Sequence, residues 1–248
     1  MDDVQKSIYN RVVLKISGEG FCVAGNQGVD PVLVESVALQ ILDARAHGCE
    51  IAVVVGGGNL VRGAAFEKKG MNRASADHMG MLGTVINALA LQDAVERQGV
   101  DSRVMTAIQM GEVAEPYILR RAIRHLEKKR VIILAGGTGN PYFSTDTTAA
   151  LRASEIGAEI LLKGTKVDGV YDKDPVLNED ACRFDEISYL DVINNRFRVM
   201  DSTAITLCME QELPIRVFSL MTEGNIRRVI CGEPVGTLVG SEELKENG

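Results

Sequence analysis

The chain has 248 residues, of which 46% are hydrophobic, which is enough to bury one large core. Its formal net charge of −7 argues against a general nucleic-acid binder, and no apolar run approaches the roughly 20 residues that a membrane span needs. The acidic start, Met1-Asp2-Asp3, lacks the pattern of a signal peptide. The five cysteines are widely spaced without a C-x-x-C pair, as is typical of reduced thiols. We therefore expect a cytoplasmic protein with no membrane or nucleic-acid partner.

Apolar runs alternate with helical patterns along the whole chain. The expected elements of the first half are a strand (11–16), a helix from the cap Asp30 to about residue 47, a strand (50–55), a long helix (75–97), a strand (102–106) and a helix (117–128). The second half continues with a strand (130–135), a helix (146–157), a strand (159–163), a long loop, a helix (201–211), a strand (215–219), a helix (225–231) and a strand (237–239). This order predicts an α/β fold: a three-layer α/β/α sandwich around a mainly parallel central sheet, in a single domain over residues 1–248.

Unusual residues follow several of these strands, at the sheet edge where ligands bind in open α/β folds. The first strand ends in Lys15-Ile16-Ser17-Gly18-Glu19. A buried lysine needs an anion or solvent, so Lys15 is a candidate for binding an anion. The alternative is an ordinary lysine at a strand end. The second strand leads into Gly56-Gly57-Gly58-Asn59 and then Arg62. We expect these glycines to supply positive φ and close backbone approach, and Arg62 to grip phosphate; a plain tight turn is the alternative.

Two later loops carry the same signal. Residues 136–146 are rich in small polar side chains that can surround a flat heterocycle, and Thr145 or Asp146 can cap the next helix. Lys163 again ends an apolar strand, and two strand-end lysines on one sheet edge are hard to explain without a polyanion. Asp77, near the start of the long helix, is either a plain helix-start carboxylate or part of a site. No His, Cys or Asp cluster has transition-metal spacing, so we expect no metal bound directly by the protein.

Together these segments resemble the amino-acid kinase family, and most closely its bacterial uridylate kinase branch. The matching segments are 15–19, 56–59 with Arg62, 71–81, 137–141 and 163–171, within a resemblance that covers residues 8–240. The resemblance implies transfer of the γ-phosphoryl group of ATP, bound with Mg²⁺, to UMP, giving ADP and UDP in pyrimidine nucleotide biosynthesis. It also implies that residues up to about 160 bind the acceptor and that residues from about 160 to 240 bind ATP.

The resemblance implies a role for each matching residue. The implied catalytic residues are Lys15, Lys163, Asp146 and Asp201. Contacts with ATP are implied for Lys15, Ile16, Ser17, Gly18, Gly58, Arg62, Thr165, Tyr171 and Asp174. Contacts with UMP are implied for Gly57, Arg62, Asp77, Thr138, Gly139, Asn140, Pro141, Tyr142, Phe143, Ser144 and Thr145, with Asp77 on the ribose hydroxyls. The effector-responsive positions are Gly20, Phe21, Cys22, Val23, Ala24, Gly25, Arg103 and Arg130.

The resemblance further implies a homohexamer that GTP activates and UTP inhibits, although Gln92 and Glu96 stand where several members carry basic residues. The acceptor would be a phosphate oxygen that is largely ionised near neutral pH, so no general base is required. Two rival functions remain: a kinase for an amino-acid carboxylate, and a nucleotide-binding regulator without turnover. Arg62 and Asp77 favour a nucleotide acceptor, and the two lysines favour turnover.

Overall fold

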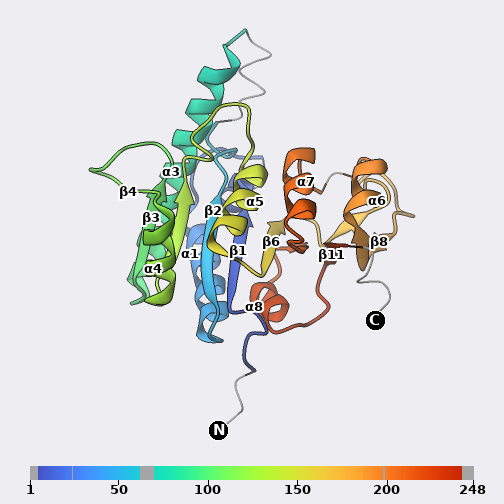
Figure 1. Ribbon diagram of the computed structural model, residues 1–248. Helices are drawn as coiled ribbons and strands as arrows, with labels where there is room; N and C mark the ends of the chain where they lie inside the picture. Colours follow the sequence, from blue (N-terminus) through green and yellow to red (C-terminus); the bar gives the residue numbers. More distant parts are fainter. Residues whose placement is uncertain (1–4, 24, 62–69, 198, 242–248) are drawn as a thin grey trace.

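The computed structural model describes residues 5–23, 25–61, 70–197 and 199–241, and its described part is built around a nine-stranded sheet (Figure 1). The strand order is β4-β3-β5-β2-β1-β6-β10-β11-β9. All neighbouring pairs in it are parallel except β10 and β11. The strands are β1 (Arg11–Ile16), β2 (Glu50–Val55), β3 (Ser102–Thr106), β4 (Glu115–Pro116), β5 (Val131–Ala135), β6 (Ile160–Thr165), β9 (Glu186–Ser188), β10 (Ile215–Ser219) and β11 (Thr237–Gly240).

Helices cover both faces of this sheet. One face carries α1 (Pro31–Ala46), α3 (Arg73–Arg97) and α8 (Asn225–Ile230). The other face carries α4 (Leu119–Glu127), α5 (Thr145–Ile156), α6 (Tyr189–Asn194) and α7 (Ser202–Glu210). The expected α/β/α sandwich is therefore confirmed. None of the helices in the described ranges is long and apolar enough to cross a membrane.

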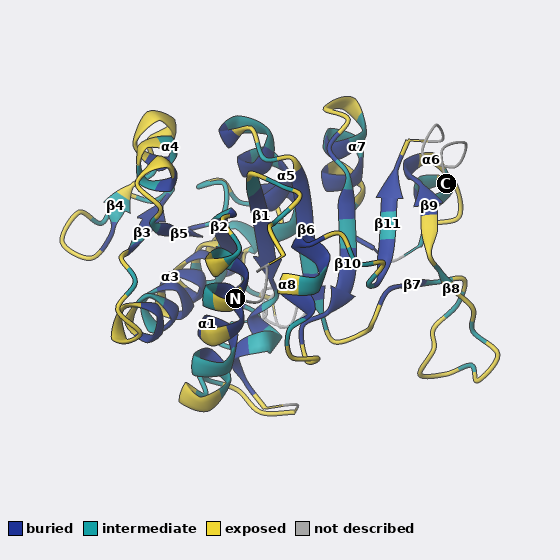
Figure 2. Cartoon of the chain, turned by 90° about the horizontal axis from the view of Figure 1, so that it is seen from below, coloured by how far each residue is buried: buried dark blue, intermediate teal, exposed yellow. Residues whose placement is uncertain are grey.

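The alternation of side chains along each strand divides the core into two layers. In β1, Val12, Leu14 and Ile16 pack on the α1 side, whereas Val13 packs on the α5 side. Successive strand side chains point to opposite faces, so Lys15 shares the α5 side with Val13. Figure 2 shows the central strands as the buried part of the molecule and the outer helix surfaces as its exposed part.

Most expected elements are found within two residues of their expected ends, and the differences lie in the short ones. The long loop after β6 contains a small hairpin, β7 (Val170–Tyr171) with β8 (Arg183–Phe184), as well as β9 and α6. A 3-10 helix, η1 (Gly18–Phe21), follows β1. Strands of two residues have no period that a sequence pattern can reveal.

The cap of α5 also differs from expectation. Ser144, rather than Thr145 or Asp146, caps this helix, and its hydroxyl oxygen accepts from the backbone N–H groups of Asp146 (3.0 Å) and Thr147 (3.1 Å). The cap therefore does not use the carboxylate of Asp146, which is left to meet other groups.

Candidate active site

A pair of lysines forms the centre of the site. Lys15 on β1 and Lys163 on β6 are register partners on adjacent parallel strands, so both side chains rise on the α5 side of the sheet. Asp146, in the first turn of α5, lies above them. Its Oδ1 is 2.7 Å from the Lys15 Nζ, and its Oδ2 is 2.8 Å from the Lys163 Nζ. One carboxylate thus joins the two lysines that the sequence analysis expected on one edge of the sheet.

Burial and charge act against each other in this cluster. Burial works to raise the pKa of Asp146, but the ammonium groups of Lys15 and Lys163 outweigh it and hold the pKa below that of an ordinary aspartate. Burial also lowers the pKa of Lys163, with a further contribution from Lys15, while Asp146 offsets part of the shift. Two cations share one carboxylate here, so the cluster attracts an anion such as a phosphate.

Asp201 lies next to the cluster of Lys15, Lys163 and Asp146 and contacts the residues around it. It caps α7, and its Oδ1 accepts from the Ala204 N–H at 3.1 Å and from the Thr147 hydroxyl at 2.9 Å. Its Oδ2 accepts a hydrogen bond from the Ser144 hydroxyl. Among the described contacts Asp201 bonds to residues that flank Asp146, and it makes no ion pair with either lysine. Its place in the fold is that of a group that fixes the start of α5 against α7.

The glycine turn 56–58 packs backbone against backbone. A Cβ on Gly56 would lie 2.7 Å from the Gly18 backbone nitrogen, and one on Gly57 would lie 2.4 Å from the Gly80 carbonyl oxygen. None of these three glycines has positive φ, so that part of the expectation is wrong. The close contact with η1 excludes a side chain at position 56, and the close contact with α3 excludes one at position 57.

The support of the turn by α3 was not predicted from the sequence. Asn87, fully buried on α3, donates to the Gly56 carbonyl oxygen and to the Asn59 Oδ1, each at 2.7 Å. The Thr84 hydroxyl accepts from the Gly136 N–H, also at 2.7 Å. One helix therefore ties two glycine loops together. A buried Asn and Thr in an otherwise apolar helix face were the only available signal.

A small pocket of about 190 Å³ opens beside this turn. Its lining brings together residues from three segments that lie apart in the sequence: Gly57, Gly58, Val61, Ala76, Asp77, Gly80, Met81, Thr84, Gly137, Phe143 and Thr145. Thr145 adjoins Asp146, so the pocket lies next to the lysine centre. Five of the predicted contact residues for nucleotides thus share one cavity, which we call the acceptor pocket.

The remaining residues of the 138–144 loop are divided between two places. Thr138 and Asn140 line a separate pocket of about 800 Å³ between α5 and α7, and Phe143 lines both pockets. Gly139 packs against Ala107. Pro141 and Tyr142 stand between Asn140 and Phe143 in the sequence, and Ser144 serves as the cap described above.

On the other side of the lysines, a pocket of about 530 Å³ is lined by the hairpin segment and the end of α6. We call it the hairpin pocket. Tyr171 and Asp174, both predicted to contact ATP, lie in its wall beside Asn195 and Phe197, which the sequence analysis missed. Thr165 ends β6, and its hydroxyl accepts from the Val167 N–H at 3.3 Å. Because Val167 lines this pocket, Thr165 lies on the path from Lys163 to it.

Residues 10–219 match the family model described as amino acid kinase family. The chain belongs to the amino acid kinase family. Solved structures agree with this assignment. UMP kinase from Bacillus anthracis shares 37% identity and a TM-score of 0.92, over 94% of this chain and 97% of that one. UMP kinase from Ureaplasma parvum shares 34% identity and a TM-score of 0.88, over 94% and 99% of the two chains. Uridylate kinase from Archaeoglobus fulgidus shares 27% identity and a TM-score of 0.70, over 92% and 99%.

Several residues of this amino acid kinase that were predicted to bind nucleotides or effectors lie outside the acceptor pocket and the hairpin pocket. Ile16 is fully buried on the α1 side, so only its backbone can face a ligand. Ser17 precedes η1, and Gly18 packs against the glycine turn. Arg62 and Ala24 fall outside the described residues. Within the described ranges no group of three or more His, Cys, Asp or Glu side chains could hold a metal ion.

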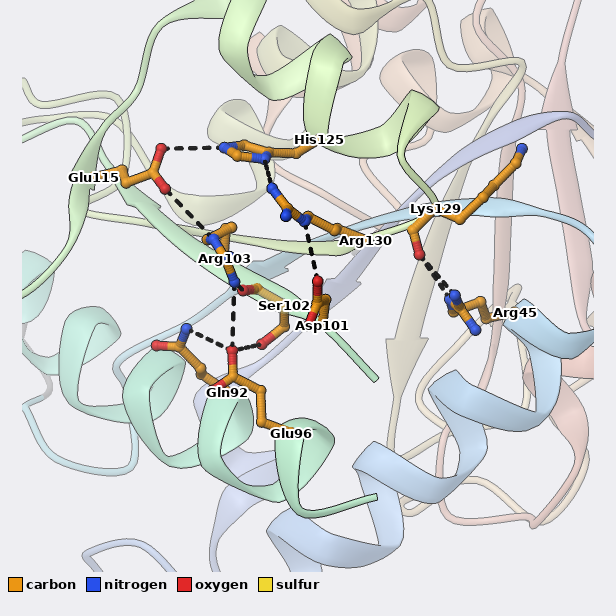
Figure 3. A network of polar contacts seen from close by, with 10 residues as sticks. All are labelled: Arg45, Gln92, Glu96, Asp101, Ser102, Arg103, Glu115, His125, Lys129 and Arg130. Carbon is orange, nitrogen blue, oxygen red and sulfur yellow. Dashed lines mark hydrogen bonds and ion pairs between the residues drawn. The ribbon is translucent and has the colours of Figure 1, made fainter. Parts of the chain in front are cut away.

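The predicted effector positions lie in two separate regions of this amino acid kinase. Residues 20–23 and 25 follow β1 at the carboxyl edge of the sheet, with Phe21 and Cys22 buried. Arg103 and Arg130 instead lie at the amino ends of β3 and β5, on the opposite edge. Figure 3 shows them in a polar network. Arg103 lies 3.8 Å from Glu96 and 3.6 Å from Glu115, and Arg130 lies 3.4 Å from Asp101.

Proposed function

We propose that the protein is a UMP kinase, which transfers the γ-phosphoryl group of ATP to UMP and yields ADP and UDP. The observation that carries this proposal is the pair of lysines joined by Asp146, with a pocket on each side. In the strand order, β1 and β6 lie between the loops after β2 and β5, which line the acceptor pocket, and the hairpin segment, which lines the larger one. Two neighbours above 30% identity are UMP kinases, which supports UMP as the acceptor.

The lysine centre suits phosphoryl transfer. The acceptor phosphate would lie in the acceptor pocket and ATP in the hairpin pocket, so that the two phosphate chains meet at Lys15 and Lys163. The transferring group carries charge on its equatorial oxygens, and the two ammonium groups would stabilise that charge. The acceptor oxygen is already ionised, so no side chain needs to take a proton. Asp146 would hold both lysines in position before substrate arrives.

We also propose that Mg²⁺ accompanies ATP. A magnesium ion in such sites is held by substrate phosphates, water and one or two carboxylates. Asp146 and Asp201 are the carboxylates at this centre, and they fit that donor set. When bound, the ion would neutralise charge on the triphosphate oxygens. Asp146 and Asp201 would hold the ion next to the two lysines.

A panel of acceptors tests the proposed activity. We expect ADP release from Mg-ATP to be at least about tenfold faster with UMP than with CMP, dUMP, aspartate or glutamate, because a pocket built for one acceptor leaves polar groups unpaired with another. A preference for aspartate or glutamate would establish the carboxylate kinase instead. Binding of ATP without ADP release would establish the regulator.

We further propose a homo-oligomer, in keeping with the hexamer that the resemblance implies. Val32 and Leu39 on α1, with Leu82 and Ile86 on α3, are apolar side chains that are each about half exposed or more. The two helices are neighbours, so these side chains lie on one outer layer. An apolar face of this kind is typical of a subunit interface.

Nucleotide regulation and location complete the proposal. We expect UTP to inhibit, as the resemblance implies. We expect GTP to activate weakly, because Arg103 and Arg130 already pair with Glu96, Glu115 and Asp101 (Figure 3). All five cysteines are free thiols, which favours the cytoplasm.

A further inference from the structure

One carboxylate ties the loop 138–143 to α3. The backbone N–H of Tyr142 donates to the Asp77 Oδ2 at 2.8 Å, across 65 residues of sequence. Arg73, one turn before Asp77, donates from its Nε to both carboxylate oxygens, at 3.0 and 2.9 Å. The Arg73 guanidinium carbon also lies 5.9 Å from the centre of the Tyr142 ring. Two residues of α3 thus hold Tyr142 by two contacts, and these two residues are themselves joined by the Arg73–Asp77 ion pair.

Tyr142 needs such contacts to keep its conformation. Its backbone φ is 73°, in the left-handed region that residues with a side chain rarely adopt. Tyr142 is 69% exposed, so burial does not hold it in this conformation. The contacts with Asp77 and Arg73 therefore decide whether this conformation persists. Phe143, the next residue, lines the acceptor pocket, so the same contacts place a wall of that pocket.

The carboxylate of Asp77 has a further acceptor position. An ionised carboxylate offers about four lone-pair sites. Among the described residues Oδ2 accepts from Tyr142 and Arg73, whereas Oδ1 accepts only from Arg73. Asp77 also lines the acceptor pocket. Its Oδ1 can therefore bind a hydroxyl of an acceptor while Oδ2 still holds the loop.

We propose that Arg73 is a positioning residue: together with Asp77 and the Tyr142 amide it forms a latch that closes the loop 138–143 over the acceptor pocket and orients Asp77 for a sugar hydroxyl. The sugar part of this inference rests on the proposed function, but the latch itself does not. Arg73 acts through Asp77, and its loss weakens acceptor recognition without changing the lysine centre.

A tryptophan reporter tests the latch without any turnover. The protein has no tryptophan, so Phe143→Trp introduces a single indole into the loop. Acrylamide quenching of that indole is compared with and without Arg73→Leu. The control is Arg97→Leu, which breaks a similar pair on the same helix, Arg97 Nε to Asp93 at 3.0 Å. We expect Arg73→Leu to shift the latch toward its open form by about tenfold, the size expected for a lost charge-assisted hydrogen bond, and to raise the quenching.

The control variant should quench as the parent does. Equal quenching in the Arg73→Leu variant and its parent overturns the latch, whatever the kinetics show. If Arg73→Leu fails to fold, Arg73→Lys replaces it, with intermediate quenching expected because an ammonium cannot reproduce the Nε contact with both oxygens. Quenching by Arg73→Lys that matches the parent overturns the latch in the same way.

Kinetics with Phe143 intact test the positioning role. We expect Arg73→Leu to lower the preference for UMP over dUMP by about tenfold through KM, with kcat within about threefold of wild type. An unchanged preference overturns this role for Arg73. If quenching rises as expected but the wild-type protein phosphorylates no UMP, the latch stands and the proposed function fails.

Discussion

At the scale of single residues, Lys15 and Lys163 carry the proposed chemistry. Replacing either by alanine should lower kcat by on the order of 10²–10³, because each supplies charge stabilisation to the transferring group. The KM for UMP should change little, since Asp77 and the glycine turn remain. Lys166→Ala is the control: this lysine is exposed and pairs with Glu19 at 3.1 Å. Single-turnover rates within threefold of wild type for both alanine variants would contradict the role.

Asp146 gives the folding free energy a pH dependence of known sign. Lys15 and Lys163 hold its pKa below the ordinary value despite burial. Because the pKa is lower in the folded state, ionised Asp146 contributes stability above an unfolded pKa of about 3.9 and loses that contribution as pH falls through the folded pKa.

The acid profile of one variant checks this sign. Asp146→Asn should be less stable than wild type at neutral pH and should lose less stability between about pH 5 and pH 2, as followed by urea unfolding. Asp93→Asn, which changes a carboxylate that is 72% exposed, should keep the wild-type profile. An acid loss in Asp146→Asn as large as in wild type would argue against the cluster.

At the scale of elements, the glycine turn depends on its contact with α3. Gly57→Ala would place a Cβ 2.4 Å from the Gly80 carbonyl oxygen, whereas a Cβ on Gly58 would meet no atom of the described residues within 4 Å. We expect Gly57→Ala to lower the free energy of unfolding by about 1–3 kcal/mol, as overpacking does, and Gly58→Ala to change it by less than about 0.5 kcal/mol. Urea unfolding of the two variants measures the difference, and equal stabilities would refute the close packing.

The elements that the sequence predicted well are those long enough to show a hydrophobic pattern. Residues 11–16 and 50–55 are mostly apolar, and both are strands at those bounds. The hairpin of β7 and β8 was missed because two residues show no alternation. Lys15 and Lys163 could be assigned to one sheet edge from their places at strand ends.

The long-range details of the site could not be predicted in the same way. The use of Ser144 as the cap depends on a backbone angle rather than on residue type. A close backbone approach was expected of the 56–58 turn, but its partners, Gly18 and Gly80, are set by tertiary packing, and the positive φ expected there is not found. The contact between Asp77 and Tyr142 joins residues 65 apart, which a local pattern cannot reveal.

At the scale of the whole molecule, the apolar outer face of α1 and α3 predicts self-association. Leu82→Glu should break the proposed oligomer, because a charge in an apolar interface is costly to bury. Leu190→Glu, a change on α6 at a leucine of similar exposure (47% against 49%), should leave the oligomer intact. Sedimentation velocity of the two variants distinguishes them, and a wild-type protein that sediments as a monomer would remove the prediction altogether.

The lysine centre is proposed to move a phosphoryl group from ATP to UMP. The most direct measurement follows the γ-phosphoryl label of ATP in the presence of Mg²⁺ and UMP. We expect the label to appear in UDP, in step with ADP, and this transfer to fall by on the order of 10²–10³ in Lys163→Ala. Label that appears only as inorganic phosphate, or that stays in ATP, would contradict it.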